Sequence, residues 1–288
     1  MFPVEALQHA MGAEVVSQRP LRGGDNAAVL LAELDDGRRV VLKTDRRGAP
    51  SIDLCTEAAG LEWLRAAGAV AVPEVFAVVA ATSTSPPFLV MEWIQEGAPT
   101  AATEPELGVA LAGLHRSGAP CFGREDRRTT GSRHLPNEPC DSWAEFYRSQ
   151  RLLPLARLAR DAGALTARDV GDLESVAGRL ELLGGDEEPP ARLHGDLWAG
   201  NRLIDGHGRS WLIDPAAHGG HREFDLAMMR LFGGFGDECF AAYDEVAPLA
   251  PGWRDRIELH QLAPLVVHAI KFGGGYAAAT GRALARYR

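Results

Sequence analysis

The feature that most constrains this chain is the segment from Arg192 to Pro215, in which two short apolar runs flank the turn sequence Asp-Gly-His-Gly. Apolar runs on either side of glycine-containing turn residues predict a β-hairpin. The hairpin would return Asp214 toward Asn201 and leave Asp196 beside both of them. The sequence therefore predicts two carboxylates and one carboxamide at a single loop, unless these residues only cap turns, as Asp and Asn often do.

The spacing inside this segment matches a phosphoryl-transfer loop. Kinases place a base aspartate five residues before an asparagine that binds Mg²⁺, and Asp196 precedes Asn201 by five positions. Gly195 stands where protein kinases have arginine, and Asp214 is followed by Pro215 where they have Phe-Gly. These two departures favour a kinase of small molecules over a protein kinase.

The N-terminal part of the chain alternates apolar runs with turns. Strands are expected on both sides of Gly23-Gly24 and of Asp36-Gly37, and the third of them carries Lys43 near its end. A glycine turn between strands can place backbone N–H groups over phosphates, although an ordinary hairpin explains the same residues. Among 30 basic residues, lysine occurs only at Lys43 and Lys271, so Lys43 is a candidate for a role that arginine cannot fill.

A helix is expected from Ser51 to Ala67, because leucines recur on one face at helical spacing. Glu57 falls on the same apolar stripe. A carboxylate that faces inward needs a cationic partner, and Lys43 on the adjacent strand is the available one. The alternative is that Glu57 lies at the edge of the stripe and reaches solvent, and that Glu62 or no residue pairs with Lys43.

Two more strands at 70–80 and 88–94 would complete a five-stranded antiparallel sheet with one main helix. The stretch 95–99, Gln-Glu-Gly-Ala-Pro, is the best linker in the chain, and helical patterns dominate after it. The sequence therefore predicts an α+β chain with a nucleotide-binding N-lobe at 1–96 and a mainly helical C-lobe at 97–288. Helices of this C-lobe are expected at 107–118, 143–158, 166–183, 226–232, 253–272 and 276–287.

Composition limits the kinds of partner. A net charge of −9 and a pI near 5.5 disfavour nucleic acid or an anionic membrane. The four cysteines form no C-x-x-C pair, so neither a zinc site nor a disulfide framework is indicated. The chain has no basic leader and no apolar run approaching the ~20 residues of a membrane span, so we expect a cytoplasmic protein.

Three motifs together resemble the fructosamine kinase (ketosamine-3-kinase) family, a branch of the protein-kinase-like fold related to aminoglycoside phosphotransferases and choline kinases. The segment 194–201, HGDLWAGN, is similar to that family's HGDLWxGN, whose tryptophan distinguishes it from aminoglycoside kinases. The segments 213–235 and 268–276 are similar to its second signature and to its late H-x-x-x-F-G-x-G-Y. The resemblance covers essentially the whole chain and implies a bilobal kinase fold.

The resemblance implies an ATP- and Mg²⁺-dependent kinase that phosphorylates the 3-hydroxyl of ketosamines, the sugar adducts of amines such as lysine side chains. Asp196 would be the base, and Asn201 and Asp214 would hold Mg²⁺. Lys43 and Glu57 would form the phosphate-anchoring pair. Nucleotide contacts are implied for Gly23, Gly24, Lys43, Met91, Glu92 and Ile94, and substrate contacts for Asp196, Trp198, Glu223 and His268.

Two other functions stay open. One is another small-molecule kinase of the same fold, acting on an aminoglycoside, a choline-like alcohol or a plain sugar. The other is a nucleotide-binding module without catalysis. The expected partner is a small ketosamine or glycated amine, and the chain is expected to be a monomer or weak dimer. Family members often carry a cysteine in the glycine loop, but residues 22–26 contain none, which puts redox control there in doubt.

Overall fold

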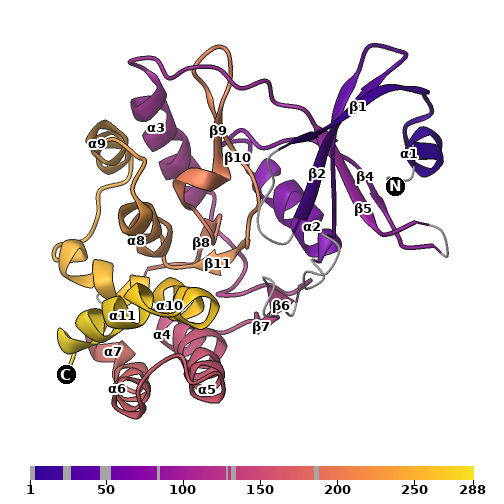
Figure 1. Cartoon of the computed structure of the whole chain (residues 1–288). Helices are drawn as coiled ribbons and strands as arrows, with labels where there is room; N and C mark the ends of the chain where they lie inside the picture. The colour runs from indigo at the N-terminus through magenta and orange to yellow at the C-terminus, as the bar shows by residue number, and fades with distance from the viewer. Residues whose placement is uncertain are drawn as a thin grey trace.

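The computed structural model describes residues 4–21, 27–45, 53–82, 85–127, 129–130, 134–184 and 188–288. A five-stranded antiparallel sheet lies at one end and a mainly helical part at the other, with a small hairpin between them (Figure 1). This arrangement confirms the predicted α+β fold class. Gly23 and Gly24 lie outside the described residues. Within the described part, no helix combines the length and the apolar character needed to cross a bilayer.

The sheet has the strand order β1-β2-β3-β5-β4 and is built from β1 (Val15–Leu21), β2 (Ala27–Leu34), β3 (Arg39–Asp45), β4 (Val75–Val79) and β5 (Phe88–Glu92). Because successive side chains alternate between the two faces of a sheet, the faces pack against different helices. Leu42 belongs to the cluster with α1 (Val4–Met11), whereas Leu89 belongs to the cluster with α2 (Leu54–Arg65). Lys43 follows Leu42 on β3 and therefore points to the α2 side.

The helix α2 begins after the N-cap Asp53 and contacts both parts of the molecule. Its Trp63 lies between Arg124 and Arg192 of the helical part, and each guanidinium carbon is 4.5 Å from the ring centroid. The helix that carries Glu57 is thus attached to the sheet on one side and to the helical part on the other. The α2 residues in the shared core are Leu54, Ala58, Leu61 and Leu64.

The helical part begins with α3 (Thr103–Arg116), and the predicted lobe boundary between 96 and 97 falls in the segment that joins β5 to α3. The predicted helix at 143–158 is divided by a π-helical turn at Tyr147–Leu152. The helix α9 was not predicted. The remaining helices are α4 (Trp143–Phe146), α5 (Leu153–Asp161), α6 (Ala167–Ala177), α7 (Leu180–Leu183), α8 (Glu223–Phe232), α9 (Asp237–Val246), α10 (Trp253–Phe272) and α11 (Gly275–Ala285).

Three short antiparallel strand pairs lie outside the five-stranded sheet in the described part of the chain. The pair that concerns function is the hairpin of β9 (Arg202–Ile204) and β10 (Ser210–Leu212), which lies between the sheet and the helices in Figure 1. It confirms the hairpin predicted at the turn sequence Asp-Gly-His-Gly. The other pairs are β6 (Thr129–Thr130) with β7 (Leu135–Pro136) and β8 (Ala191–Leu193) with β11 (His218–Gly220).

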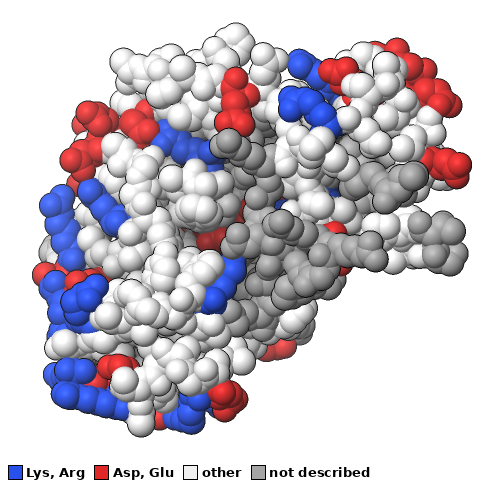
Figure 2. Space-filling view, viewed as in Figure 1, with Lys and Arg blue, Asp and Glu red and all other residues white. Residues whose placement is uncertain are grey.

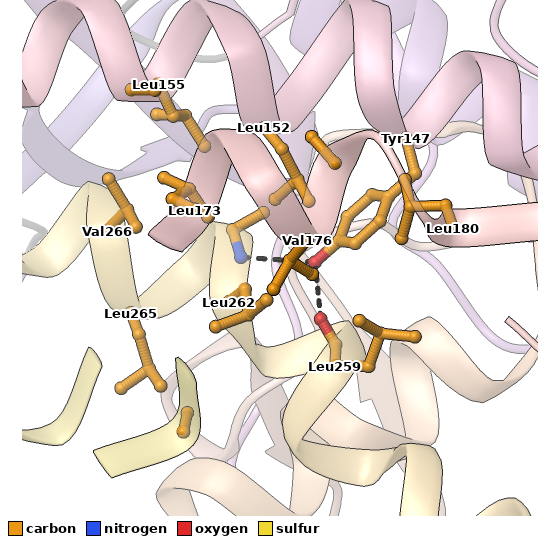
Figure 3. Packing of buried hydrophobic residues seen from close by; sticks show 14 of the residues in the cluster. Tyr147, Leu152, Leu155, Leu173, Val176, Leu180, Leu259, Leu262, Leu265 and Val266 are labelled. Atoms are coloured by element: carbon orange, nitrogen blue, oxygen red, sulfur yellow. Dashed lines mark hydrogen bonds between the residues drawn. The ribbon is translucent and has the colours of Figure 1, made fainter. Parts of the chain in front are cut away.

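The long helix α10 contains Pro264, which has no N–H to donate to the carbonyl oxygen of His260 four residues earlier. The Tyr147 hydroxyl fills this gap. It lies 3.0 Å from the carbonyl oxygens of both Leu259 and His260, and it accepts the Ala263 N–H at 3.1 Å. Figure 3 shows the Tyr147 hydroxyl bonded to the Leu259 carbonyl oxygen. The tyrosine side chain therefore completes the interrupted hydrogen-bond pattern of α10 from within the core.

We expect Tyr147→Phe to lower the free energy of unfolding by about 1 to 3 kcal/mol, because it leaves buried backbone groups of α10 without partners. Calorimetry should show a lower melting temperature, by roughly 2 to 4 °C for each kcal/mol. Tyr276→Phe is the control, because the Tyr276 hydroxyl makes no hydrogen bond to the residues that the structure describes. Equal melting temperatures for the two variants would contradict this role of Tyr147.

Candidate active site

The β9–β10 hairpin brings together the three side chains that the sequence predicted at one loop. Ile213 N–H donates to the Asn201 carbonyl oxygen at 3.0 Å, which brings the end of the hairpin back to its start. The Asn201 side-chain Nδ2 donates to the Asp196 backbone oxygen at 2.8 Å and to its carboxylate at 3.1 Å. The same Nδ2 lies 3.5 Å from the Asp214 carbonyl oxygen. Asn201 therefore links the two ends of the loop.

A buried carboxylate on α8, Asp225, holds the beginning of this loop. Its two oxygens accept the N–H groups of His194 at 2.7 Å and Gly195 at 2.9 Å, and one of them lies 3.3 Å from His115 Nε2. Gly195 has a φ of +80°, and a Cβ atom there would lie 2.1 Å from the Ala216 carbonyl oxygen. Only glycine fits at this position, where protein kinases have arginine.

Asp196 lies in the wall of a cavity of about 200 Å³. Desolvation raises the pKa of its carboxyl to about 7; the hydrogen bond from Asn201 acts in the opposite direction, and the negative charge of Asp214 raises the pKa further. A carboxylate with a pKa near neutrality is a better proton acceptor than an ordinary aspartate and is still partly ionised at neutral pH. These properties suit a general base.

Lys43 lies between two carboxylates. Its Nζ is 2.9 Å and 2.8 Å from the two oxygens of Glu57 and 2.7 Å from Asp214 Oδ1. Burial alone would lower the pKa of Lys43, but the two carboxylates raise it above its usual value, so the ammonium stays charged. Burial also raises the pKa of Glu57, an effect that Lys43 opposes. The predicted Lys43–Glu57 contact is present, and Asp214 is a partner that the sequence did not indicate.

We expect Lys43→Arg to lower kcat/KM although it conserves charge, because the longer, planar guanidinium does not fit between Glu57 and Asp214. Glu57→Gln should cost less in the Lys43→Arg background than alone, with a coupling energy of about 0.5 to 3 kcal/mol. Steady-state kinetics of the two single variants and the double variant measure this coupling. Losses that simply multiply, or a fully active Lys43→Arg, would show that the contact does not support catalysis.

Asp214 and Asn201 offer oxygen donors of the kind that Mg²⁺ prefers. The Asp214 side chain is 38% exposed, and Asn201 uses Nδ2 for Asp196, which leaves Oδ1 without a hydrogen bond to any described residue. Asp196, Glu57 and Asp214 also carry more negative charge than Lys43 neutralises. In addition, Asp214 has a φ of +53°, a left-handed conformation that is uncommon outside glycine and clusters at functional sites. The donor set and its charge therefore fit a divalent cation.

A second cavity, of about 650 Å³, lies between the sheet and the loop, and Figure 2 shows this face hollowed at its centre, with acidic atoms visible inside. Ile94 N–H makes no hydrogen bond to the described residues, whereas Glu92 N–H is donated to the Glu74 carbonyl oxygen at 2.8 Å. A free N–H beside an apolar wall suits the edge of a planar heterocycle such as adenine. The predicted nucleotide and metal contacts in this wall are Lys43, Met91, Glu92, Ile94, Asn201 and Asp214.

The smaller cavity holds only part of the predicted substrate site. His268 lines it together with Asp196, and the His268 Nδ1 lies 2.8 Å from the Pro264 carbonyl oxygen. Trp198 lines the larger cavity instead; its ring meets Phe232 edge-on at 6.0 Å, and Phe232 in turn lies 4.8 Å from the His268 ring. Among the lining residues that were not predicted, three have polar or charged side chains: Thr130, Arg151 and His218.

Glu223, implied as a substrate contact, lines neither of these two cavities. It is 1% exposed, and its two oxygens accept hydrogen bonds from Arg256 at 2.6 Å and 2.9 Å. Burial would raise the pKa of Glu223, but hydrogen bonds from His260 and Arg256 lower it to about 2. His221 and His260 lie close enough to share a metal with Glu223, but Arg256 already takes both carboxylate oxygens. Glu223 is thus the anion of a buried ion pair.

Comparison with known proteins gives consistent results. The family model for fructosamine kinase matches residues 3–287. A probable ketoamine kinase of Synechocystis sp. is 37% identical over 223 residues, which cover 76% of this chain and 73% of the relative. A crystal structure of a Thermobifida fusca protein assigned to the fructosamine-3-kinases is 42% identical, with a TM-score of 0.88 and 98% of both chains covered. An aminoglycoside phosphotransferase shares the fold at 17% identity, with a TM-score of 0.64 and coverage of 98% of this chain and 97% of the other.

Proposed function

Because the chain belongs to the fructosamine kinase family and is accordingly a phosphotransferase, we propose that it transfers the γ-phosphoryl group of ATP to the 3-hydroxyl of ketosamines. One observation carries the proposal. Asp196 lies in the small cavity, while its hydrogen-bond partner Asn201 lies in the large one with Asp214. A hydroxyl group in the small cavity and a phosphate chain in the large cavity would therefore meet at Asp196.

In this reaction the acceptor oxygen forms a bond to the γ-phosphorus while the bond from that phosphorus to the bridging oxygen breaks, so that ADP leaves. Asp196 orients the acceptor hydroxyl and takes its proton. Lys43, held by Glu57, contacts the phosphates. Asn201 and Asp214 would hold Mg²⁺, which when bound neutralises charge on the phosphate oxygens.

The wider role follows from the same chemistry. The acceptors would be small ketosamines or glycated amines, including adducts of lysine side chains, and the reaction would serve deglycation or ketosamine metabolism in the cytoplasm. The nucleotide would bind mainly to the N-lobe at 1–96 and the ketosamine to the C-lobe at 97–288, in a monomer or weak dimer. A net charge of −9 supports a small-molecule partner over nucleic acid.

Phosphate transfer from ATP across a panel of acceptors tests this function. The panel contains ketosamines of five- and six-carbon sugars, an aminoglycoside, choline and the corresponding free sugars. We expect transfer to the ketosamines, with NMR coupling between phosphorus and the proton on carbon 3. Preferential transfer to the aminoglycoside, or ATP binding without transfer to any acceptor, would contradict the proposal.

A further inference from the structure

The wall of the small cavity away from the nucleotide carries buried polar groups that the reaction at Asp196 does not use. Thr130 is 7% exposed, Arg151 is 4% exposed and His218 is 1% exposed, and all three line the cavity. We infer that this wall binds the hydroxyl groups of the sugar chain beyond the reacting carbon and so determines which sugar is accepted. The inference rests on the proposed function and adds the residues that select the substrate.

His218 supplies a hydrogen-bond acceptor without a partner. Its Nδ1 lies 2.8 Å from the Ala216 carbonyl oxygen, which can only accept, so Nδ1 carries the proton. The buried Nε2 makes no hydrogen bond to the described residues. Burial, followed by the charge of Arg151, lowers the pKa of His218 to about 3, so the ring is neutral at physiological pH. A ligand at Nε2 must therefore donate a hydrogen bond.

Arg151 supplies donors from the same wall. Its guanidinium bonds to the carbonyl oxygens of Pro136 at 2.6 Å and Gln150 at 2.9 Å and to Asn137 Oδ1 at 2.8 Å, and it has no carboxylate partner among the described residues. These contacts fix the guanidinium without neutralising it. Its central carbon also lies 4.5 Å from the centroid of the Phe146 ring.

The donor and the acceptor are held by one aromatic ring. His218 stacks against Phe146 with ring centroids 5.3 Å apart, and Arg151 contacts the same ring. The Thr130 hydroxyl, also buried and without a hydrogen bond to the described residues, can donate or accept. The wall therefore has a fixed acceptor, a fixed cationic donor and one adaptable group.

The combination of an acceptor, a cationic donor and a hydroxyl group restricts which ligands this wall can bind. A hydroxyl group can donate to His218 Nε2 and accept from Arg151 at the same time. A carboxylate or phosphate would face the lone pair of His218 with nothing to donate, and an ammonium group would face the guanidinium of Arg151. The site thus fits a neutral polyol chain, and it disfavours both the polycationic rings of an aminoglycoside and a sugar phosphate.

The test compares a six-carbon N-alkyl ketosamine with its 4-, 5- and 6-deoxy analogues as phosphate acceptors. The wild type should lose about ten- to a hundred-fold in kcat/KM on at least one analogue, because removal of a hydroxyl leaves a buried protein group unpaired. His218→Phe, which keeps the stacking on Phe146, should lose a similar factor on the parent ketosamine and little more on that analogue. Thr130→Val should behave in the same way if its hydroxyl is the partner.

Thr103→Val is the matched control, because it removes a buried hydroxyl that bonds the Gly208 carbonyl oxygen outside this cavity. It should keep the full preference for the parent ketosamine. The inference is wrong if the wild type treats all analogues within about two-fold, if neither His218→Phe nor Thr130→Val reduces the preference, or if a 6-phosphorylated ketosamine is the better acceptor. Absence of transfer to every ketosamine would instead contradict the proposed function, and calorimetric binding of the same compounds would then decide the inference without turnover.

Discussion

Asp196→Asn is expected to lower kcat by about a hundred- to ten-thousand-fold while the affinity for ATP is nearly unchanged. The substitution removes the proton acceptor but keeps the shape of the side chain and one oxygen that can accept from Asn201 Nδ2. The residues that line the larger cavity, including Lys43 and Asp214, stay in place. Steady-state kinetics with a ketosamine, combined with calorimetric titration of ATP, separate the two effects.

Asp237→Asn is the control for this experiment. It also removes one carboxylate, but the Asp237 side chain is 90% exposed on α9 and pairs only with Arg230 among the described residues. Activity close to that of the wild type is expected. An Asp196→Asn enzyme with near wild-type kcat would show that another group takes the proton.

Asp214→Ala is expected to impair both the binding of Mg·ATP and turnover, with kcat/KM falling by at least about a hundred-fold, because it removes the principal charged ligand proposed for the metal. The φ of +53° at this position complicates the interpretation of the alanine variant, since a left-handed conformation costs a residue with a Cβ about 1 to 2 kcal/mol. Asp214→Asn separates charge from conformation, because asparagine tolerates this region.

Titration with Mg²⁺ at fixed ATP measures the effect of both variants. Both should need higher Mg²⁺ concentrations, and only Asp214→Ala should also lose thermal stability. Asp214→Ala also removes a partner of Lys43, whereas Asp214→Asn keeps an oxygen that can accept a hydrogen bond from Lys43. If Asp214→Asn needed the same Mg²⁺ concentration as the wild type, other residues would have to bind the metal.

The grouping of Asp196, Asn201 and Asp214 could be predicted from the sequence, because the features that bring these residues together are local. Asp196 and Asn201 lie on one short loop at a fixed spacing, and the turn between two apolar runs returns Asp214 to them. The Lys43–Glu57 contact could be predicted for a different reason. A carboxylate on the buried stripe of a helix requires a cation, and few buried cations were available next to that helix.

The polar residues on the far wall of the small cavity could not be predicted in this way. Thr130, Arg151 and His218 come from three separate elements, and each has an ordinary interpretation within its own segment. Arg151 sits in a predicted amphipathic helix, where a solvated arginine is common. The short strands that carry Thr130 and His218, the π-helical turn that carries Arg151, and α10 meet at this cavity, and no pattern within one segment indicates that they do. Pro264 inside a long helical pattern indicated only that another group could bond the carbonyl that proline leaves without an N–H.

Glu223 is a different case, because its role as a substrate contact was implied only by the resemblance to the family. Its partner Arg256 lies on α10, 33 residues further along the chain. Long-range charge pairing of this kind leaves no local pattern. The helix α9 was missed because the alternation of small, acidic and aromatic residues at 237–246 does not stand out until Cys239, Phe240 and Tyr243 are packed against α3.

The carboxylate of Asp225 has a consequence for how the enzyme can move. It joins the consecutive amides of His194 and Gly195 to α8 and, through the buried His115, to α3. If this loop moved without α8, the buried carboxylate of Asp225 would lose two hydrogen bonds. We therefore expect the loop to keep its place relative to the helical part when substrates bind, so that the nucleotide and the sugar approach Asp196 and not the reverse.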